Sequence, residues 1–234
     1  MSFRTCSARI AGILAAAACV ADAGSLSRDV DFTETYDAGS TDVGHWGLTT
    51  NTLRSRVIER TGGHPGGYLY SEVSTPIPTW STVSKRYQSG GDDPIGQDSI
   101  FVGDYYARRI NHVSADLRIY QVGSWTRGRT VTLHLVRWEV GSNSVAFEAF
   151  YSPPDISAAP TGWHHYDFRV DARSARVPPG WTFRRGDGTP GTDADWATFM
   201  HQIDFVGICY WRPGYFYPAL GIWKLGIDNI HVGS

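Results

Sequence analysis

The feature that most constrains the fold of this chain is the loop Gly62-Gly63-His64-Pro65-Gly66-Gly67. Four glycines bracket a proline within six residues, and an apolar segment that begins at Tyr68 follows directly. Glycine allows the positive φ angles and close backbone approaches that a tight corner needs, while proline fixes φ and disfavours helix before it. We therefore expect a compact loop that leads straight into a β-strand. We predict that this loop has a structural role and no chemical one.

The N-terminal residues 1–23 have the features of an export signal. Arg4 and Arg9 form a basic region, residues 10–20 are a short alanine-rich apolar stretch, and Ala21-Asp22-Ala23 supplies small residues for cleavage. The stretch is shorter than the roughly 20 apolar residues that cross a bilayer, so a retained membrane helix is the weaker alternative. Lipid attachment at Cys19 is a second alternative. We predict a secreted or periplasmic protein with no membrane span after cleavage.

The remaining residues, 24–234, are enough for one sizeable β-domain and short for two, so we predict a single domain. Cleavage would leave Cys209 as the only cysteine, and no intrachain disulfide is then expected. Cys209 stands in the apolar run 203–210, which favours a buried small hydrophobic side chain over a nucleophile.

The charge balance argues against a nucleic-acid partner. The chain has 21 Lys and Arg against 23 Asp and Glu, and its arginines are scattered in pairs such as Arg108-Arg109 and Arg184-Arg185. A nucleic-acid-binding surface normally carries a basic stripe. We therefore expect no nucleic-acid partner.

Alternation of apolar and polar residues predicts antiparallel strands. Segments 113–120, 131–135 and 166–170 each alternate with a period of two, which buries one face of each strand. Only residues 192–200 have helical spacing with a cap, where Thr192 or Asp193 would begin a short helix. Together these patterns predict an all-β fold, an antiparallel β-sandwich of jelly-roll type with one or two short helices.

A four-residue turn at 141–144 predicts a hairpin between Val140 and Val145. In that register Arg137 would lie opposite Glu148. We interpret these two residues as an ion pair and not as part of an active site.

Several stretches resemble the laminin IV type A (laminin B) domain and related secreted bacterial β-sandwiches. The loop at 62–68 is similar to the Gly-Asn-Pro-Gly-Gly loop of that family, with His64 in place of asparagine. Phe101-Val102-Gly103-Asp104-Tyr105 and Trp163-His164-His165-Tyr166 follow, and the segment 225–232 resembles the ending of many jelly-roll and galactose-binding-like domains. The resemblance implies a jelly-roll sandwich without known catalytic machinery, used for adhesion or for binding at surfaces.

Motifs of the common hydrolases are missing from the sequence. It contains no nucleophile elbow, no zinc-protease motif and no phosphate-binding glycine loop. A glycosidase would need two carboxylates roughly 5 to 9 Å apart, and none of the glutamates has a second carboxylate at strand spacing. A carboxylate pair assembled from distant strands is the alternative that we keep. We interpret the eight histidines as surface or hydrogen-bonded residues and not as ligands of a transition metal.

A structural calcium ion is the one cofactor that we predict. Calcium takes carboxylate and backbone oxygens, and exported β-sandwiches often join their first and last strands through one. Glu34 and Asp37 near the start and Asp228 near the end are the candidate ligands. The alternative is that Asp228 and Asn229 only form hydrogen bonds to a neighbouring loop.

Aromatic residues indicate where a ligand would bind. They make up 13% of the chain, and five of them surround a Pro-Gly turn in residues 210–218. Such rings stack on the apolar faces of sugars, and arginine and tyrosine supply hydrogen bonds. The predicted ligand-binding residues are Trp211, Arg212, Tyr215, Tyr217 and, in a separate loop, Trp125. The alternative is that the 210–218 loop folds back and covers the core.

These observations predict an exported, non-catalytic binding module for glycans or for an extracellular matrix or surface component. The first alternative is a carbohydrate-active enzyme, either a glycoside hydrolase or a polysaccharide lyase, on a β-sandwich scaffold. The second is a structural or adhesive protein with a protein partner. An open aromatic surface would favour binding, converging carboxylates would favour an enzyme, and a flat apolar patch or free sheet edge would favour assembly.

Overall fold

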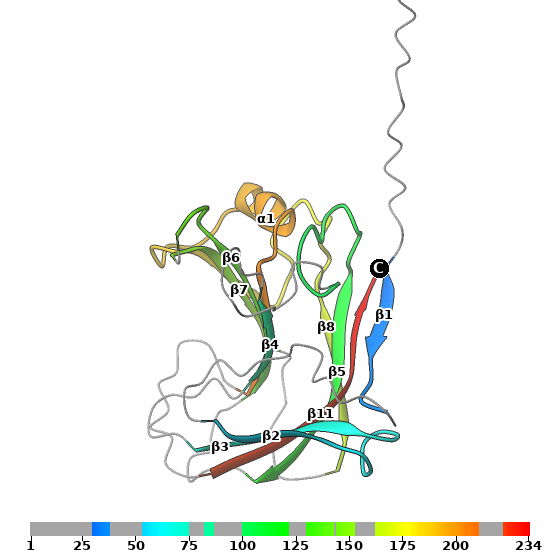
Figure 1. Ribbon diagram of the computed structural model, residues 1–234. Coiled ribbons are helices and arrows are strands. Elements are labelled where there is room, and N and C mark those ends of the chain that lie inside the picture. Colours follow the sequence, from blue (N-terminus) through cyan, green and yellow to red (C-terminus); the bar gives the residue numbers. More distant parts are fainter. Residues whose placement is uncertain are drawn as a thin grey trace, which may run out of the picture.

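The computed structural model contains two antiparallel β-sheets, sheet A and sheet B, which enclose a common core (Figure 1). It describes residues 30–37, 53–74, 82–86, 100–121, 130–142, 144–152, 162–210 and 222–234. The predicted export signal lies outside these residues. Within them, no helix is long and apolar enough to cross a membrane.

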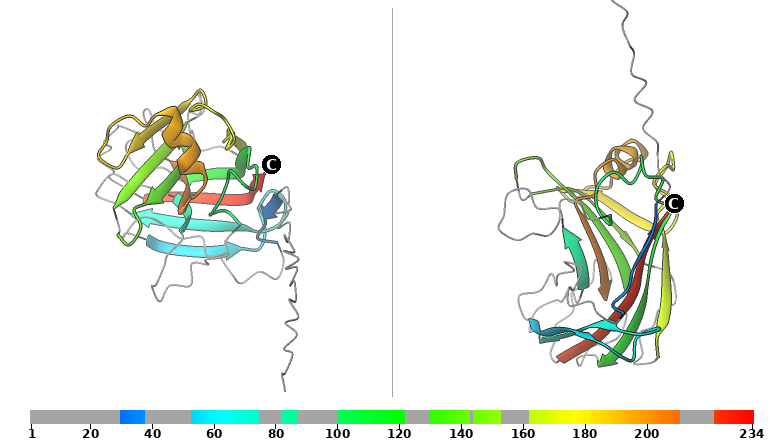
Figure 2. Two further views of the ribbon diagram at one scale, coloured as in Figure 1. Left: turned by 90° about the horizontal axis from the view of Figure 1, so that it is seen from above. Right: turned by 45° about the vertical axis from the view of Figure 1, so that its right-hand side comes forward.

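Sheet A has six strands in the order β2-β3-β11-β5-β8, with β1 also paired to β11. The strands are β1 (Asp31–Glu34), β2 (Leu53–Glu59), β3 (Tyr68–Ser74), β5 (His112–Gln121), β8 (His164–Arg169) and β11 (Ile222–Gly233). The long strand β11 pairs with β3 through residues 222–227 and with β1 through residues 230–233 (Figure 2).

Sheet B has five strands in the order β4-β10-β6-β7-β9. These are β4 (Thr82–Arg86), β6 (Val131–Trp138), β7 (Val145–Tyr151), β9 (Trp181–Arg185) and β10 (Phe205–Tyr210). The chain passes repeatedly from one sheet to the other, as it does between β3 and β4, between β5 and β6, and between β7 and β8. This is the predicted β-sandwich of jelly-roll type.

Period-two alternation is confirmed in the central strands. In β5, the odd-numbered residues from Val113 to Ile119 are buried in the core. Leu133 and Leu135 of β6 enter the same core from sheet B. The even-numbered residues of β5 consequently point to the opposite side of sheet A.

One short helix, α1 (Asp193–Met200), lies at one end of the sandwich (Figure 1). Thr192 caps it, and the side chain of Asp195 accepts a hydrogen bond from the backbone of Thr192 in return, which completes a capping box. Trp196, Phe199 and Met200 are buried. The predicted helix and its cap are confirmed.

The hairpin between β6 and β7 has a different register from the predicted one. Trp138, and not Val140, pairs with Val145, and a register shift between Arg137 and Trp138 recovers one of these two residues, so that Glu148 lies opposite Val136. Arg137 donates to the backbone oxygen of Thr198 at 2.7 Å. The predicted pair of Arg137 with Glu148 is therefore wrong, because β6 stops pairing at Trp138, two residues before the predicted turn.

The glycine-rich loop joins β2 to β3, as the sequence predicts. Gly62 and Gly66 have positive φ angles of 93° and 86°. At Gly67, a Cβ atom would lie 1.9 Å from the backbone oxygen of Tyr36, so that only glycine fits where the loop meets the segment after β1. Cys209 of β10 is buried, which agrees with its interpretation as a small hydrophobic residue.

Candidate functional site

The outer face of sheet A, which points away from the core, gathers polar and aromatic side chains from several strands. Cross-strand pairing places Asp116 of β5 opposite His165 of β8 and opposite Asp228 of β11. Ser114 is likewise opposite Asp167 of β8. Residues directly opposite each other in a sheet carry their side chains on the same face.

A group of residues that we call the polar cluster occupies the middle of this face. The Asp116 carboxylate accepts hydrogen bonds from Nδ1 of His165 at 2.7 Å and from Nδ1 of His64 at 3.1 Å. The Asn229 side-chain amide donates to the same carboxylate at 2.7 Å and also to the backbone oxygen of His64. The polar cluster consists of His64, Asp116, His165, Asp228 and Asn229.

Asp228 attaches the glycine-rich loop to β11. Its carboxylate is fully buried and accepts hydrogen bonds from the backbone N–H of His64 at 2.7 Å and of Asn229 at 2.8 Å. Asn229 has a positive φ of 48° and stands where the pairing of β11 with β5 shifts. The bulge and the loop thus fix each other, and His64 is held against Asp116.

The pKa values of the two aspartates of the polar cluster are shifted in opposite directions. Burial by itself would raise the pKa of Asp116, but hydrogen bonds from Asn229, His165 and His64 outweigh it and lower this pKa. Burial raises the pKa of Asp228, and the nearby charges of Asp37 and Asp116 add to the increase. Asp116 is therefore the carboxylate of the cluster that is held in its ionised form.

Four aromatic residues form an aromatic patch next to the polar cluster: Tyr68, Tyr70, Tyr120 and Trp163. The Tyr68 ring lies 6.0 Å from that of Tyr120 and 5.3 Å from that of Trp163, between centroids. Tyr70 and Tyr120 are 6.0 Å apart. Tyr68 is buried, whereas the other three rings are partly exposed.

Gly226 of β11 makes room for this patch. A Cβ atom there would lie 2.9 Å from the Tyr68 ring and 3.0 Å from the Trp163 ring, so the rings pack directly on the strand backbone. The Trp163 indole N–H donates to the backbone oxygen of Gly62 at 2.8 Å. The guanidinium of Arg118 lies 4.7 Å from the centre of the Tyr120 ring.

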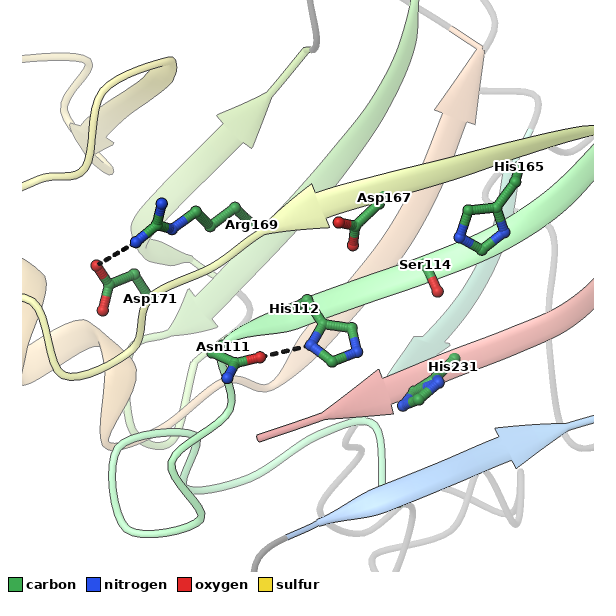
Figure 3. Close-up of a pocket in the computed structure, with 8 residues that line it drawn as sticks. All are labelled: Asn111, His112, Ser114, His165, Asp167, Arg169, Asp171 and His231. Atoms are coloured by element: carbon green, nitrogen blue, oxygen red, sulfur yellow. Dashed lines mark hydrogen bonds and ion pairs between the residues drawn. The ribbon is translucent and has the colours of Figure 1, made fainter.

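A pocket lined by polar and charged residues continues the face on the other side of the polar cluster (Figure 3). Its lining residues are Asn111, His112, Ser114, His165, Asp167, Arg169, Asp171 and His231. The His112 and His231 rings are 4.8 Å apart, and burial together with the charge of His112 lowers the pKa of His231. Arg169 pairs with Asp171 at 3.9 Å.

The three candidate calcium ligands do not form one group in the described residues, although the charge of Asp37 acts on Asp228. Among these residues, no group of three or more His, Cys, Asp or Glu side chains is placed to hold a metal ion. Glu34 lies in β1 opposite Ile230, and the Asp37 carboxylate lies against Gly66 of the glycine-rich loop. Asp228 binds backbone N–H groups of His64 and Asn229, which is the alternative that the sequence left open.

The predicted ligand-binding residues Trp211, Arg212, Tyr215, Tyr217 and Trp125 lie outside the described residues. The polar cluster and the aromatic patch were not predicted from the sequence. The available signal was the alternation in residues 113–120, whose even positions include Asp116, Arg118 and Tyr120. These polar and aromatic residues alternate with the buried ones, and they could have indicated that the outer face of this strand carries the candidate site.

Comparison with known proteins gives only distant structural similarities. No protein-family model matches the chain, so the resemblance to laminin IV type A domains is not confirmed. No curated protein matches it either.

Two solved structures are similar in outline. One is the family 11 carbohydrate-binding module of the cellulosomal cellulase Lic26A-Cel5E of Clostridium thermocellum, with 13% identity, a TM-score of 0.47, and coverage of 88% of this chain and 95% of that chain. The other, described as the solution structure, dynamics and binding studies of CtCBM11, has 16% identity, a TM-score of 0.42, and coverage of 90% and 98%. Neither similarity is strong enough to transfer residues or ligands to this chain.

Proposed function

We propose that this protein is an exported, non-catalytic module that binds glycans through the outer face of sheet A. The observation that supports this most is the aromatic patch beside the polar cluster on one sheet face. Partly exposed aromatic rings stack on the apolar faces of sugars, and adjacent polar groups supply oriented hydrogen bonds.

The dimensions of the face suit a chain of several sugar units. Along β5, the distance from Tyr120 to His112 is roughly 26 Å at about 3.3 Å per residue. Aromatic rings lie at the Tyr120 end, Asp116 lies in the middle, and the pocket lies at the His112 end. A ligand lying along β5 would meet stacking surfaces first and hydrogen-bonding groups next.

Three sequence-based expectations belong to the same proposal. Export through residues 1–23 would place the module outside the cytoplasm, where glycans and extracellular surfaces are available. Trp125, Trp211, Arg212, Tyr215 and Tyr217 would add contacts from loops. A calcium ion bound by Asp228 together with Glu34 or Asp37 would stabilise the fold without taking part in recognition.

One observation favours an enzyme as a second candidate. Asp116 and Asp228 lie directly opposite each other, and their pKa values are moved in opposite directions, as in many acid–base pairs. Asp228 is fully buried, however, and its carboxylate already accepts two backbone N–H groups. A substrate would have no access to it, so we prefer a binding function.

Affinity electrophoresis through gels that contain soluble polysaccharides tests the proposal, with and without a calcium chelator. We expect the wild-type protein to be retarded by one class of glycan, and Tyr120→Ala and Trp163→Ala to lose the retardation while keeping the wild-type unfolding transition. Phe32→Ala is the matched control, because Phe32 is a partly exposed aromatic residue that packs on Phe101 at the opposite side of sheet A.

The other outcomes separate the alternatives. Equal retardation of all variants would contradict the assigned face and would leave the loop aromatics as the remaining contact. Shortening of a polysaccharide would favour the enzyme. The absence of retardation by any glycan would favour a protein partner in adhesion or assembly.

A further inference from the structure

The hydrogen bonds around Asp116 determine which ring nitrogen of two histidines carries the proton. The Asp116 side chain is only 7% exposed, and its pKa is lowered by the hydrogen bonds that outweigh its burial. An ionised carboxylate can only accept hydrogen bonds. Nδ1 of His165, at 2.7 Å, and Nδ1 of His64, at 3.1 Å, must therefore both donate to it.

The opposite nitrogen of each ring is consequently a hydrogen-bond acceptor in the neutral state. A neutral imidazole has one donor and one acceptor nitrogen. The side chains of His64 and His165 are 60% and 59% exposed, and neither Nε2 atom has a partner in the described part of the chain. Among the described residues, the outer face thus carries two exposed acceptor atoms whose orientation is fixed by one buried carboxylate.

Two cations of this face lie close to carboxylates, and a third, Arg118, lies over the Tyr120 ring. Arg169 is 3.9 Å from Asp171, and Lys224 is 3.8 Å from Glu72. Asp167 adds a further carboxylate to the pocket lining. A sugar carboxylate or sulfate has only acceptor oxygens, so it would meet the Nε2 atoms without a hydrogen bond and would be desolvated beside existing negative charge.

We propose that His64 and His165 contact the ligand through Nε2, and that the ligand is a neutral glycan whose hydroxyl groups donate to these two atoms. Asp116 acts through the histidines and is a positioning residue. This inference rests on the proposed function and specifies its ligand class. The positions of the protons on His64 and His165 can be tested without any ligand.

Long-range ¹H–¹⁵N spectra of the histidine rings, recorded at mildly alkaline pH, test the proton positions. We expect the Nδ1-protonated tautomer for His64 and His165 in the wild-type protein. Asp116→Asn should move both rings towards a tautomer mixture, because an amide can donate as well as accept. Asp167→Asn is the matched control, since Asp167 lies on the same face of β8 and should leave both tautomers unchanged.

Wild-type rings that carry the proton on Nε2 would overturn the proposal even if glycan binding is confirmed. The decisive spectrum is that of the wild-type protein, so the test does not depend on the folding of Asp116→Asn.

Binding to matched polysaccharides tests the ligand class. The probes are mixed-linkage β-glucan, glucomannan and galactan, each before and after oxidation of its primary hydroxyls to carboxylates. We expect oxidation to weaken binding about three- to tenfold, as the loss of one or two neutral hydrogen bonds would do. His165→Ala should weaken binding to the neutral form by a similar factor, and His165→Gln should restore part of it, because the Gln oxygen is an acceptor.

Equal or tighter binding of the oxidised forms would overturn the assigned ligand class. So would unchanged binding by both His165→Ala and His64→Ala. If none of the polysaccharides binds, the proposed function fails and the ligand class fails with it, whereas the spectra decide the positioning role of Asp116 separately.

Discussion

The outer faces of the two sheets both place a histidine against a carboxylate, but they bury opposite partners. On sheet A, His165 lies 2.7 Å from Asp116, and the exposed fractions of these side chains are 59% and 7%. On sheet B, His134 lies 3.5 Å from Glu148, and the fractions are 6% and 18%. The same pair of chemical groups is thus open to solvent on one face and enclosed on the other.

The surroundings explain the difference. The His134 ring stacks on Phe150 at 4.3 Å and meets Phe205 edge-on at 5.3 Å, while Arg184 binds Glu148 at 2.5 Å. Aromatic packing and a cation hold these groups within the structure. On sheet A a buried carboxylate instead orients two exposed rings. We infer that the sheet B pair stabilises the fold and that the sheet A pair is available for recognition.

The largest expected effect is on stability, from removing the two histidines separately. His134→Ala should lower the free energy of unfolding by about 2–4 kcal/mol, because it leaves a cavity against Phe150 and removes the partner of Glu148. His165→Ala should change it by no more than about 0.5 kcal/mol, since its ring is mostly exposed. Urea unfolding measures the free energy of unfolding of both variants. Equal losses of stability would contradict the different roles inferred for the two histidines.

A smaller loss of stability is expected from Glu148→Gln. The substitution removes the charge that pairs with Arg184 and His134, and we expect a loss of about 2 kcal/mol, less than for a fully buried ion pair. Glu139→Gln, at the exposed turn after β6, is the control and should be neutral within about 0.5 kcal/mol. If the two variants unfolded at the same denaturant concentration, Glu148 would have no stabilising role.

On sheet A, a substitution that moves the aromatic patch should affect binding. Gly226→Ala adds a methyl group within 3.0 Å of Tyr68 and Trp163 and should displace the rings, with a loss of glycan affinity of about threefold to tenfold. Gly162→Ala is the matched control, because nothing lies within 4 Å of the added methyl group. Titration calorimetry compares the two, and an unchanged affinity of Gly226→Ala would count against the patch as the contact.

The smallest effect is the pH dependence of stability that comes from sheet B. Burial lowers the pKa of His134, so the folded state favours the neutral ring. The resulting stability is complete above the unfolded pKa of about 6.5 and decreases as the pH falls below it. Burial would raise the pKa of Glu148, but its hydrogen bonds to His134 and Arg184 lower it, and its contribution is lost only below about pH 4.5.

The control for this pH dependence is His134→Phe, which keeps an aromatic ring beside Phe150. Its thermal midpoint should vary less between about pH 7.5 and pH 5.5 than that of the wild-type protein. A wild-type midpoint that rises as the pH falls through this range would contradict the sign.

Local features of the fold were predictable from the sequence, and the site was not. Alternation identified β5, and the capping residue Thr192 identified α1, because both signals lie within a few neighbouring residues. The register of β7 was missed because β6 stops pairing at Trp138 and not at Val140, and neither this longer connection nor the bulge at Arg137 is visible in the alternation.

The polar cluster was missed for a different reason. It joins His64, Asp116, His165 and Asp228, which are far apart in the sequence and meet only through the pairing of β5, β8 and β11. The glycine-rich loop was assigned to the fold alone. Its packing on the bulge at Asn229 is what brings His64 to the candidate site.

Backbone ¹H–¹⁵N spectra recorded during titration with the retained glycan, cut into oligosaccharides, test the central claim most directly. The account predicts that shifts concentrate on the outer face of sheet A, at Ser114, Tyr120, His165 and the Trp163 indole, while His134 and Glu148 of sheet B remain unchanged. Shifts confined to β6, β7 and β9 would show that the ligand binds at sheet B and would contradict it.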